Sequence, residues 1–112
     1  MNFAPIPTVA ASDVPADGFL LDVREPDEWA AGHAEGALHI PIGEVVARAG
    51  EVSEQAGDAR VHVVCRVGGR SAQVTQFLVA QGVDAVNVDG GMLDWAAAGR
   101  PLVSDRGEPF VL

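Results

Sequence analysis

The sequence predicts an α/β fold: a five-stranded parallel sheet with helices on both faces, a three-layer α/β/α arrangement. Strand-like apolar runs alternate with helix-like segments four times along the 112 residues. That order calls for parallel strands joined by right-handed crossover helices. The length suits one hydrophobic core rather than two. We therefore expect a single domain over residues 1–112, with its core at about 6–102 and a C-terminal tail at 103–112.

The first half of the chain supplies three strands and two helices of this pattern. Residues 6–9 are a short apolar piece next to proline, which suits an edge strand, and residues 19–22 are a brief buried strand. Residues 26–31 form a short helix, with proline at its first position and glycine just past its end. Residues 37–40 are the third strand. Apolar residues at intervals of three and four predict a helix over about 43–55.

The second half continues the alternation around the only cysteine. Residues 61–64 are an apolar strand that ends at Cys65. We expect a helix to begin near residue 71 and to stop at the glycine at 82. Residues 85–88 are the fifth strand, and a last helix opens near residue 92. Val, Leu and Ala are expected to form the core around Trp29, Phe77 and Trp95.

Charge and composition exclude several classes of function. The formal net charge is −9 and the chain has no lysine. Nucleic-acid binding is disfavoured, because phosphate backbones are held by clusters of Lys and Arg. The first residues lack the features of a secretory signal, and no window is long enough for a transmembrane helix. We expect a cytoplasmic protein without nucleic-acid or membrane partners.

Cys65 cannot form an intramolecular disulfide, and it cannot make a metal site alone. A lone cysteine is more often a buried small hydrophobe than a reactive thiol. Its position reverses that preference, because ligands of parallel sheets lie beyond the carboxyl ends of the strands. His33, His39 and His62 lack metal-site spacing and are interpreted as hydrogen-bonding residues. No metal and no cofactor is expected.

The loop after Cys65 has the composition of an anion site. Gly68 and Gly69 let the backbone approach a ligand closely. The helix that follows points unpaired N–H groups back towards the loop, and Arg66 and Arg70 add full positive charges. We expect this loop to lie open to solvent and to hold an anion or an anionic sulfur.

Three segments resemble motifs of the rhodanese-like sulfurtransferase family, small α/β domains that carry sulfur as a cysteine persulfide. They are LLDVREPDEWAAGHAEGALHIP at 20–41, VVCRVGGRSAQ at 63–73 and VDGGMLDW at 88–95. Together, in this order and spacing, they are a strong match over about residues 6–102. The one departure places Ala34 and Glu35 where the family usually has Ile and Pro, away from the chemistry. The resemblance implies the strand order 3-2-4-5-1, with Cys65 at the end of the fourth strand.

The resemblance also implies roles for individual residues. Cys65 becomes the sulfur acceptor, and Asp22 and Arg24 match positions thought to brace the active-site loop. We interpret Ser71 as a cap or a donor to the loop, because the sequence places no base beside it. The loop that cradles the sulfur consists of Arg66, Val67, Gly68, Gly69, Arg70 and Ser71.

The activity implied is that of a thiosulfate sulfurtransferase. The Cys65 thiolate attacks the outer sulfur of thiosulfate or a similar small anionic donor and releases sulfite. The sulfur then passes to a thiophilic acceptor, cyanide in vitro or a thiol in vivo. We expect Arg66 and Arg70 to bind the donor, since a guanidinium can contact two oxygens at once. In the alternative, one arginine pairs with a carboxylate such as Asp22 and only orders the loop.

Three other classes of function fit parts of this pattern. A sulfur-relay module would hold the persulfide for one protein partner and turn over slowly with free thiosulfate. A cysteine-dependent phosphatase is disfavoured, because its loop has one more residue between cysteine and arginine than the four between Cys65 and Arg70. A structural domain with a dead site is disfavoured, because the cysteine and the loop glycines are present.

Overall fold

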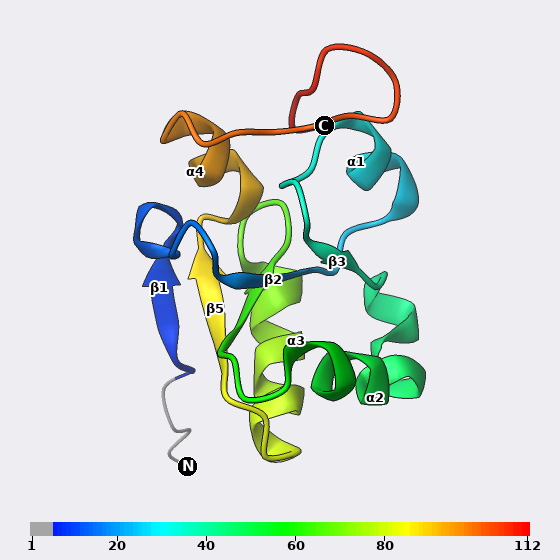
Figure 1. Cartoon of the computed structure of the whole chain (residues 1–112), viewed down its shortest axis with the longest axis vertical. Coiled ribbons are helices and arrows are strands. Elements are labelled where there is room, and N and C mark those ends of the chain that lie inside the picture. The colour runs from blue at the N-terminus through cyan, green and yellow to red at the C-terminus, as the bar shows by residue number, and fades with distance from the viewer. Residues whose placement is uncertain (1–5) are drawn as a thin grey trace.

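The computed structural model describes residues 6–112, which contain a five-stranded parallel sheet (Figure 1). Each neighbouring pair of strands runs parallel. From one edge to the other, the order of strands is β1, β5, β4, β2 and β3. This is the order 3-2-4-5-1 taken from the opposite edge, so the predicted topology is confirmed. The strands are β1 (Thr8–Ala10), β2 (Phe19–Asp22), β3 (Leu38–His39), β4 (Val61–Val64) and β5 (Ala85–Asp89).

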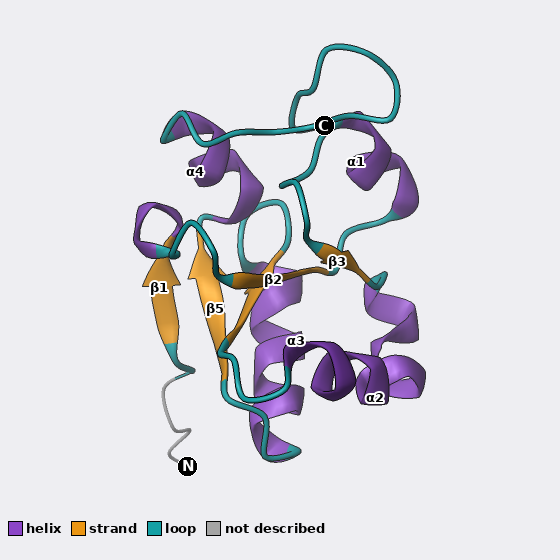
Figure 2. Cartoon of the chain, in the orientation of Figure 1, coloured by secondary structure: helices purple, strands orange, loops and turns teal. Residues whose placement is uncertain are grey.

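Helices cover both faces of the sheet, as the alternation predicts (Figure 2). The helices α2 and α3 pack with one cluster of buried side chains, and α4 packs with a second cluster on the other face. No helix within residues 6–112 has the length and apolarity needed to cross a membrane. The α-helices are α1 (Pro26–Ala31), α2 (Val45–Ala56), α3 (Gly69–Ala80) and α4 (Gly91–Ala97), with short 3₁₀ turns η1 (Ala11–Asp13) and η2 (Ile42–Glu44).

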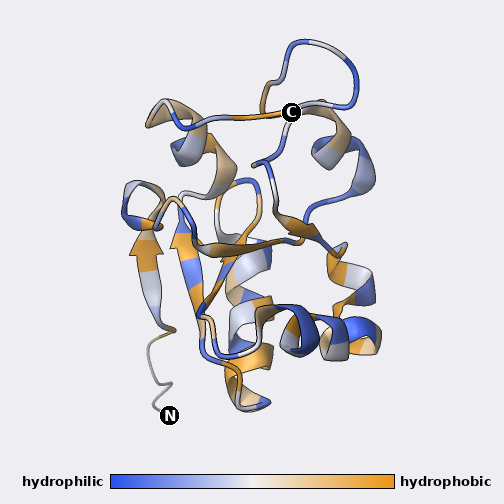
Figure 3. Cartoon of the chain, in the orientation of Figure 1, coloured by the Kyte–Doolittle hydropathy of each residue, from blue (hydrophilic) through white to orange (hydrophobic). Residues whose placement is uncertain are grey.

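The central strand β4 explains how one sheet serves two cores. All its residues are buried, and Figure 3 shows hydrophobic colours over much of the sheet, interrupted by hydrophilic positions such as those in β5. Successive side chains of a strand point to opposite faces. Accordingly, Val61 and Val63 belong to the cluster under α2 and α3, whereas Val64 belongs to the cluster under α4. Cys65 therefore follows a strand that is fixed from both sides.

Several element boundaries differ from the sequence prediction. The helix after Cys65 begins at Gly69 rather than near Ser71, because Gly68 takes a left-handed conformation with φ 111° and turns the chain into the helix at once. β1 is shifted to 8–10. The third strand is shorter than the predicted 37–40.

The three aromatic anchors are buried to different degrees. Trp95 is 7% exposed and belongs to the α4 cluster, and Phe77 packs at the margin of the α2 and α3 cluster. Trp29 is only half-buried. Its ring stacks between the imidazoles of His33 and His39, at centroid distances of 3.6 and 4.6 Å. Trp29 therefore organises the α1 region rather than the core.

The C-terminal tail is integrated into the fold more closely than a loose surface segment would be. Val103 and His33 exchange backbone hydrogen bonds of 2.8 and 2.9 Å, and the Phe110 N–H donates to the last carbonyl of α1. Leu102 and Val111 pack against the α4 cluster. The tail therefore contacts the α1 region near both of its ends, while the segment between them forms a projecting loop (Figure 1).

Candidate active site

Cys65 is the first residue after β4, and three hydrogen-bond donors converge on its sulfur. The Gly68 N–H donates to Sγ at 3.1 Å, the Ser71 N–H at 3.4 Å and the Ser71 hydroxyl at 3.3 Å. Burial raises the pKa of the Cys65 thiol. Hydrogen bonds from Ser71, Gly68 and Val67 outweigh burial, so the pKa lies below its ordinary value. The site therefore favours a sulfur anion.

The thiol is less accessible than an open loop would make it. Arg66, Val67 and Gly69 are exposed, as expected, but Cys65 is only 1% exposed. The groups that donate to Sγ lie against it and so remove its contact with solvent. A sulfur donor therefore needs a local opening around the loop to reach Sγ.

Backbone carbonyls of the loop are held by groups outside it. The Met92 N–H at the start of α4 donates to the Cys65 carbonyl at 2.8 Å, and the Leu93 N–H donates to the Arg66 carbonyl at 3.1 Å. The Asn87 side-chain amide on β5 donates to the Gly68 carbonyl at 3.2 Å. With these carbonyls turned away from Sγ, the loop N–H groups are left to face it.

Arg70 forms a two-pronged ion pair with Glu28 on α1. Its Nη1 lies 2.6 Å from Oε1, and its Nη2 lies 2.9 Å from Oε2. The hydrogen bond from Arg70 is the main reason that the pKa of the Glu28 carboxyl lies below its ordinary value. The sequence allows each loop arginine either to bind the donor or to pair with a carboxylate such as Asp22. Arg70 is paired, and its partner is Glu28 rather than Asp22.

Arg66 has different surroundings from Arg70. Its side chain is exposed, and its Nε donates to the Leu112 carbonyl at 3.0 Å. Within residues 6–112, no side-chain carboxylate lies within ion-pair distance of Arg66. Among the hydrogen bonds of the described residues, none involves its terminal nitrogens Nη1 and Nη2.

Asp22 and Arg24 form a fully buried ion pair, with Nη2 and Oδ2 2.7 Å apart and both side chains 0% exposed. The same guanidinium donates to the Glu28 carbonyl at 3.3 Å and to the Gly32 carbonyl at 2.8 Å. Among the described residues, no side-chain hydrogen bond from this pair reaches the 66–71 loop. The pair therefore holds the backbone of α1 at Glu28 and just beyond its end at Gly32.

The histidines have the hydrogen-bonding roles that their positions predict. Each contacts a backbone carbonyl through a ring nitrogen, which must then carry the proton. The pairs are His33 with Trp29 at 2.7 Å, His39 with Arg24 at 2.8 Å and His62 with Phe19 at 3.0 Å.

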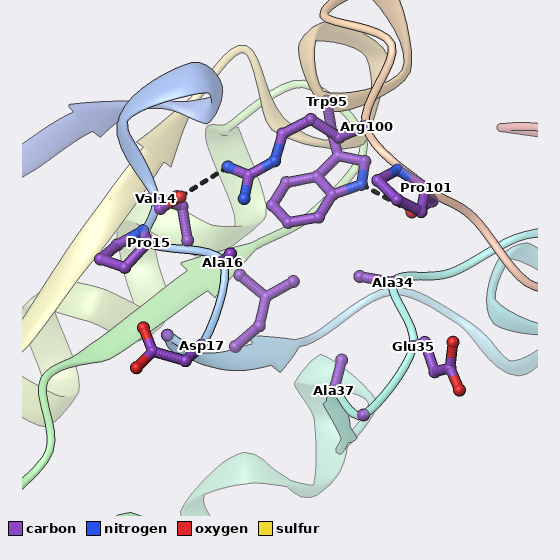
Figure 4. Close-up of a pocket in the computed structure, with 13 residues that line it drawn as sticks. Val14, Pro15, Ala16, Asp17, Ala34, Glu35, Ala37, Trp95, Arg100 and Pro101 are labelled. Carbon is purple, nitrogen blue, oxygen red and sulfur yellow. Dashed lines mark hydrogen bonds between the residues drawn. The ribbon is translucent and has the colours of Figure 1, made fainter.

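A separate hollow of about 490 Å³ lies apart from the cysteine loop (Figure 4). Trp95 forms part of its wall, and the Arg100 guanidinium lies 4.0 Å from the centre of that ring while donating to the Val14 carbonyl at 2.7 Å. None of its lining residues belongs to 65–71. The hollow and the cysteine loop are therefore separate features of the surface.

Comparison with known proteins identifies the family to which this arrangement belongs. A family model of the rhodanese-like domain matches residues 9–98. The chain belongs to the rhodanese-like domain family. A protein from Allochromatium vinosum named sulfurtransferase is 37% identical over 92 residues, which cover 81% of this chain and 83% of that protein.

Two further relatives of this rhodanese-like domain extend the comparison. YrkF of Bacillus subtilis, named provisionally as a sulfur carrier protein, is 40% identical over 77 residues, which cover 68% of this chain but only 40% of YrkF. The crystal structure of a rhodanese-related protein from Thermoplasma volcanium matches with a TM-score of 0.79 at 32% identity, covering 87% of this chain and 97% of that one. The fold is therefore shared with proteins of similar size and with parts of larger ones.

Two residues that shape the site of this rhodanese-like domain are not identified by sequence alone. Glu28 is the kind of acidic residue expected in the first turn of any helix, and no local pattern shows that α1 lies beside the cysteine loop. Asn87 carries a weak signal, a polar residue in the otherwise apolar middle of β5. Its Oδ1 is buried without a hydrogen-bond partner, so the side chain is held through its amide nitrogen alone.

Proposed function

We propose that this chain moves sulfane sulfur as a persulfide on Cys65, from thiosulfate or a similar donor to a thiophilic acceptor. Sulfur transfer in general is supported by relatives named as a sulfurtransferase and as a sulfur carrier. The finer proposal is carried by one observation, the convergence of donors from Gly68 and Ser71 on Sγ. Fixed donors of this kind stabilise charge on sulfur as it develops during transfer.

The proposed reaction has two half-reactions. The Cys65 thiolate attacks the outer sulfur of thiosulfate, a sulfur–sulfur bond forms on Cys65, and sulfite leaves with the electron pair of the broken bond. The acceptor, cyanide in vitro or a thiol in vivo, then attacks the outer sulfur of the persulfide and displaces the Cys65 thiolate. Because the chain has a single cysteine, the sulfur must leave to another molecule. A thiol that has to stay reduced between turnovers is compatible with the reducing cytoplasm. We propose that the reaction takes place there.

A second candidate is a relay module that keeps the persulfide for one protein partner. Two observations favour it. Arg70 is already paired with Glu28, which leaves a free anionic donor with fewer cationic contacts, and Cys65 is 1% exposed. Such a module would form the persulfide readily but turn over slowly with thiosulfate and cyanide.

Mass spectrometry of the intact protein tests the proposal. Thiosulfate is expected to add the mass of one sulfur atom, and cyanide is expected to remove it. The Cys65→Ser variant is the matched control and should gain nothing. The rate of thiocyanate formation then separates the enzyme from the relay module. If neither thiosulfate nor a thiol persulfide loads sulfur onto Cys65, the proposal is wrong.

A further inference from the structure

The ion pair between Glu28 and Arg70 blocks one way of binding a sulfur donor. Both terminal nitrogens of Arg70 already donate to the Glu28 carboxylate, at 2.6 and 2.9 Å. While Glu28 holds this edge, a sulfonate-type group such as the one in thiosulfate cannot use both terminal nitrogens for an end-on two-pronged contact. Arg70 lies close enough to the sulfur for the Cys65 charge to help raise its pKa. Arg70 also belongs to the short loop that follows Cys65, so the edge held by Glu28 belongs to the candidate site.

Glu28 is held in place from its own helix. The Glu25 N–H donates to Glu28 Oε1 at 3.0 Å as part of a capping box, and Arg24 Nη1 donates to the Glu28 carbonyl. The Glu28 side chain is only 13% exposed. By contrast, Arg48 on α2 pairs with Glu44 at the end of η2 and with Glu51 on α2, whose side chains are 55% and 41% exposed. Glu28 is therefore a fixed carboxylate, and an anionic donor that binds the terminal nitrogens of Arg70 must compete with it or displace it.

Donors differ in how much this competition affects them. Thiosulfate carries a sulfonate group, which the Glu28 carboxylate repels. The terminal nitrogens of Arg70, which could bind that sulfonate, are already bound to Glu28. The persulfide of a thiol, R–S–SH, has no sulfonate, so only its outer sulfur has to enter the ring of donors from Gly68 and Ser71. The Glu28–Arg70 pair should therefore weaken the binding of sulfonate-type donors and leave the binding of thiol persulfides almost unaffected.

We propose that Glu28 is a positioning residue that reserves Arg70 and thereby shifts donor preference from sulfonate-type anions to thiol persulfides. The inference rests on the proposed persulfide chemistry of Cys65. In the favoured reaction the Cys65 thiolate attacks the outer sulfur of R–S–SH, and a sulfur–sulfur bond forms on Cys65. The donor's own sulfur–sulfur bond breaks, and the thiolate R–S⁻ leaves with its electron pair. The transferred sulfur keeps its proton until it ionises against the loop donors.

The Glu28→Gln variant tests this role while preserving the helix start, because glutamine also serves in a capping box. It removes the charge that holds Arg70. The KM for thiosulfate is expected to fall about tenfold with little change in kcat, the size of one charge-assisted contact. Turnover with the persulfide of an uncharged thiol such as 2-mercaptoethanol should change by less than about twofold, since such a donor has no oxyanion group for Arg70 to bind.

Two further variants separate the effect from general electrostatics and from misfolding. Glu51→Gln makes the same change in net charge on α2 and should leave both donors unaffected. Arg70→Ala is expected to raise the thiosulfate KM more in the Glu28→Gln background than in the natural chain, because only there is the guanidinium available. The thiosulfate KM values are compared only among variants that are folded, and a thermal melt of each variant checks this.

The possible outcomes distinguish this inference from the proposed function. An unchanged thiosulfate KM in Glu28→Gln, with Cys65 still accepting sulfur, overturns the role of Glu28 and leaves the persulfide chemistry standing. A KM that falls equally in Glu51→Gln also overturns it. Failure of the natural chain to load sulfur from either donor overturns the proposed function instead.

Discussion

At the residue scale, the site depends on a few hydrogen bonds that end on one sulfur. Sequence reasoning finds Cys65 and Ser71, because a cysteine placed between a buried strand and a glycine loop is typical of a reactive thiol. It does not find that Arg70 pairs with Glu28, since 42 residues separate the two and no local pattern joins them. Short-range chemistry is readable from the chain, whereas contacts between distant elements need the fold.

The hydroxyl of Ser71 gives the first prediction. Burial raises the pKa of the Cys65 thiol, and the Ser71 hydroxyl makes the largest of the opposing contributions. The thiolate of the natural protein should therefore persist below the pH at which an ordinary cysteine, with a pKa of about 8.5, becomes protonated. In Ser71→Ala the midpoint should move upward. A titration of the thiolate's ultraviolet absorbance measures it cleanly, because the chain has one cysteine.

A matched variant tests whether the shift in the titration midpoint is specific to Ser71. Ser53 is exposed on α2, outside the Cys65 site, so Ser53→Ala should leave the midpoint where it is. If Ser71→Ala titrates like the natural protein, the backbone N–H groups alone account for the lowered pKa.

At the element scale, α4 orients the loop that follows Cys65. In the described residues, no side chain of α4 forms a hydrogen bond with Sγ. Its first N–H groups hold the carbonyls of Cys65 and Arg66, and this requires a close approach of the two backbones. Gly91 permits that approach. A Cβ there would overlap the carbonyls of Cys65 and Arg66, and the residue has φ +56°, a conformation that favours glycine. The second glycine of the VDGGMLDW motif is therefore required by backbone contact.

Replacing Gly91 with alanine should damage both stability and the site. Overlap and left-handed backbone together are expected to cost at least about 2 kcal/mol of unfolding free energy. Urea unfolding measures this cost, and mass spectrometry should show reduced sulfur loading. Gly50 in α2 is the control, because nothing lies near its Cβ position and alanine there should stabilise the helix by about 0.5–1 kcal/mol. Equal effects at the two glycines would contradict this role of Gly91.

The buried pair of Asp22 and Arg24 joins β2 to α1, and breaking it should be costly. In Asp22→Asn the Arg24 charge loses its only carboxylate while both side chains remain fully buried. Removing one partner of such a pair costs about 3–5 kcal/mol. The same change at Asp84, whose pair with Arg60 is exposed, should cost at most about 1 kcal/mol. Comparable urea midpoints for the two variants would show that the buried pair contributes little.

The sequence predicts the presence of each helix and strand more reliably than the residues at which it begins and ends. Short apolar runs predict the strands, and apolar periodicity or end signals such as Pro26 and Gly32 predict the helices. The start of α3 instead depends on the conformation of Gly68, which none of these patterns reveals. β3 pairs only at the sheet edge, along β2, so its length is set by that partner rather than by its own residues. Boundaries are decided by tertiary contacts, and these are absent from a local reading of the sequence.

At the scale of the whole molecule, alternation predicts a parallel sheet but not the order of its strands. The order 3-2-4-5-1 came from the resemblance, because crossovers in either direction along the sheet satisfy the same local pattern. The C-terminal tail is a similar case. Residues 103–112 lack periodicity, yet they pair with His33 and the end of α1, so their attachment depends on surfaces that exist only after folding.

Gly32 offers a way to test how the tail is attached. Its backbone is extended, with φ 178°, so alanine fits the local conformation. The added Cβ would instead overlap the backbone of Phe110. Gly32 itself is fixed by Arg24, which donates to its carbonyl at 2.8 Å, so the tail should be the part that moves.

The Gly32→Ala variant should therefore release the tail while the sheet stays intact. Amide hydrogen exchange is expected to speed up at Val103 and Phe110, whose N–H groups bond to the α1 region, and to remain slow at Val63 in β4. The loss of these contacts should lower the unfolding free energy by about 1–3 kcal/mol. Gly43→Ala, where nothing lies near the new Cβ, should change neither quantity. Slow exchange at Phe110 in Gly32→Ala would mean that the tail accommodates the methyl group and that the region around Arg24 yields instead.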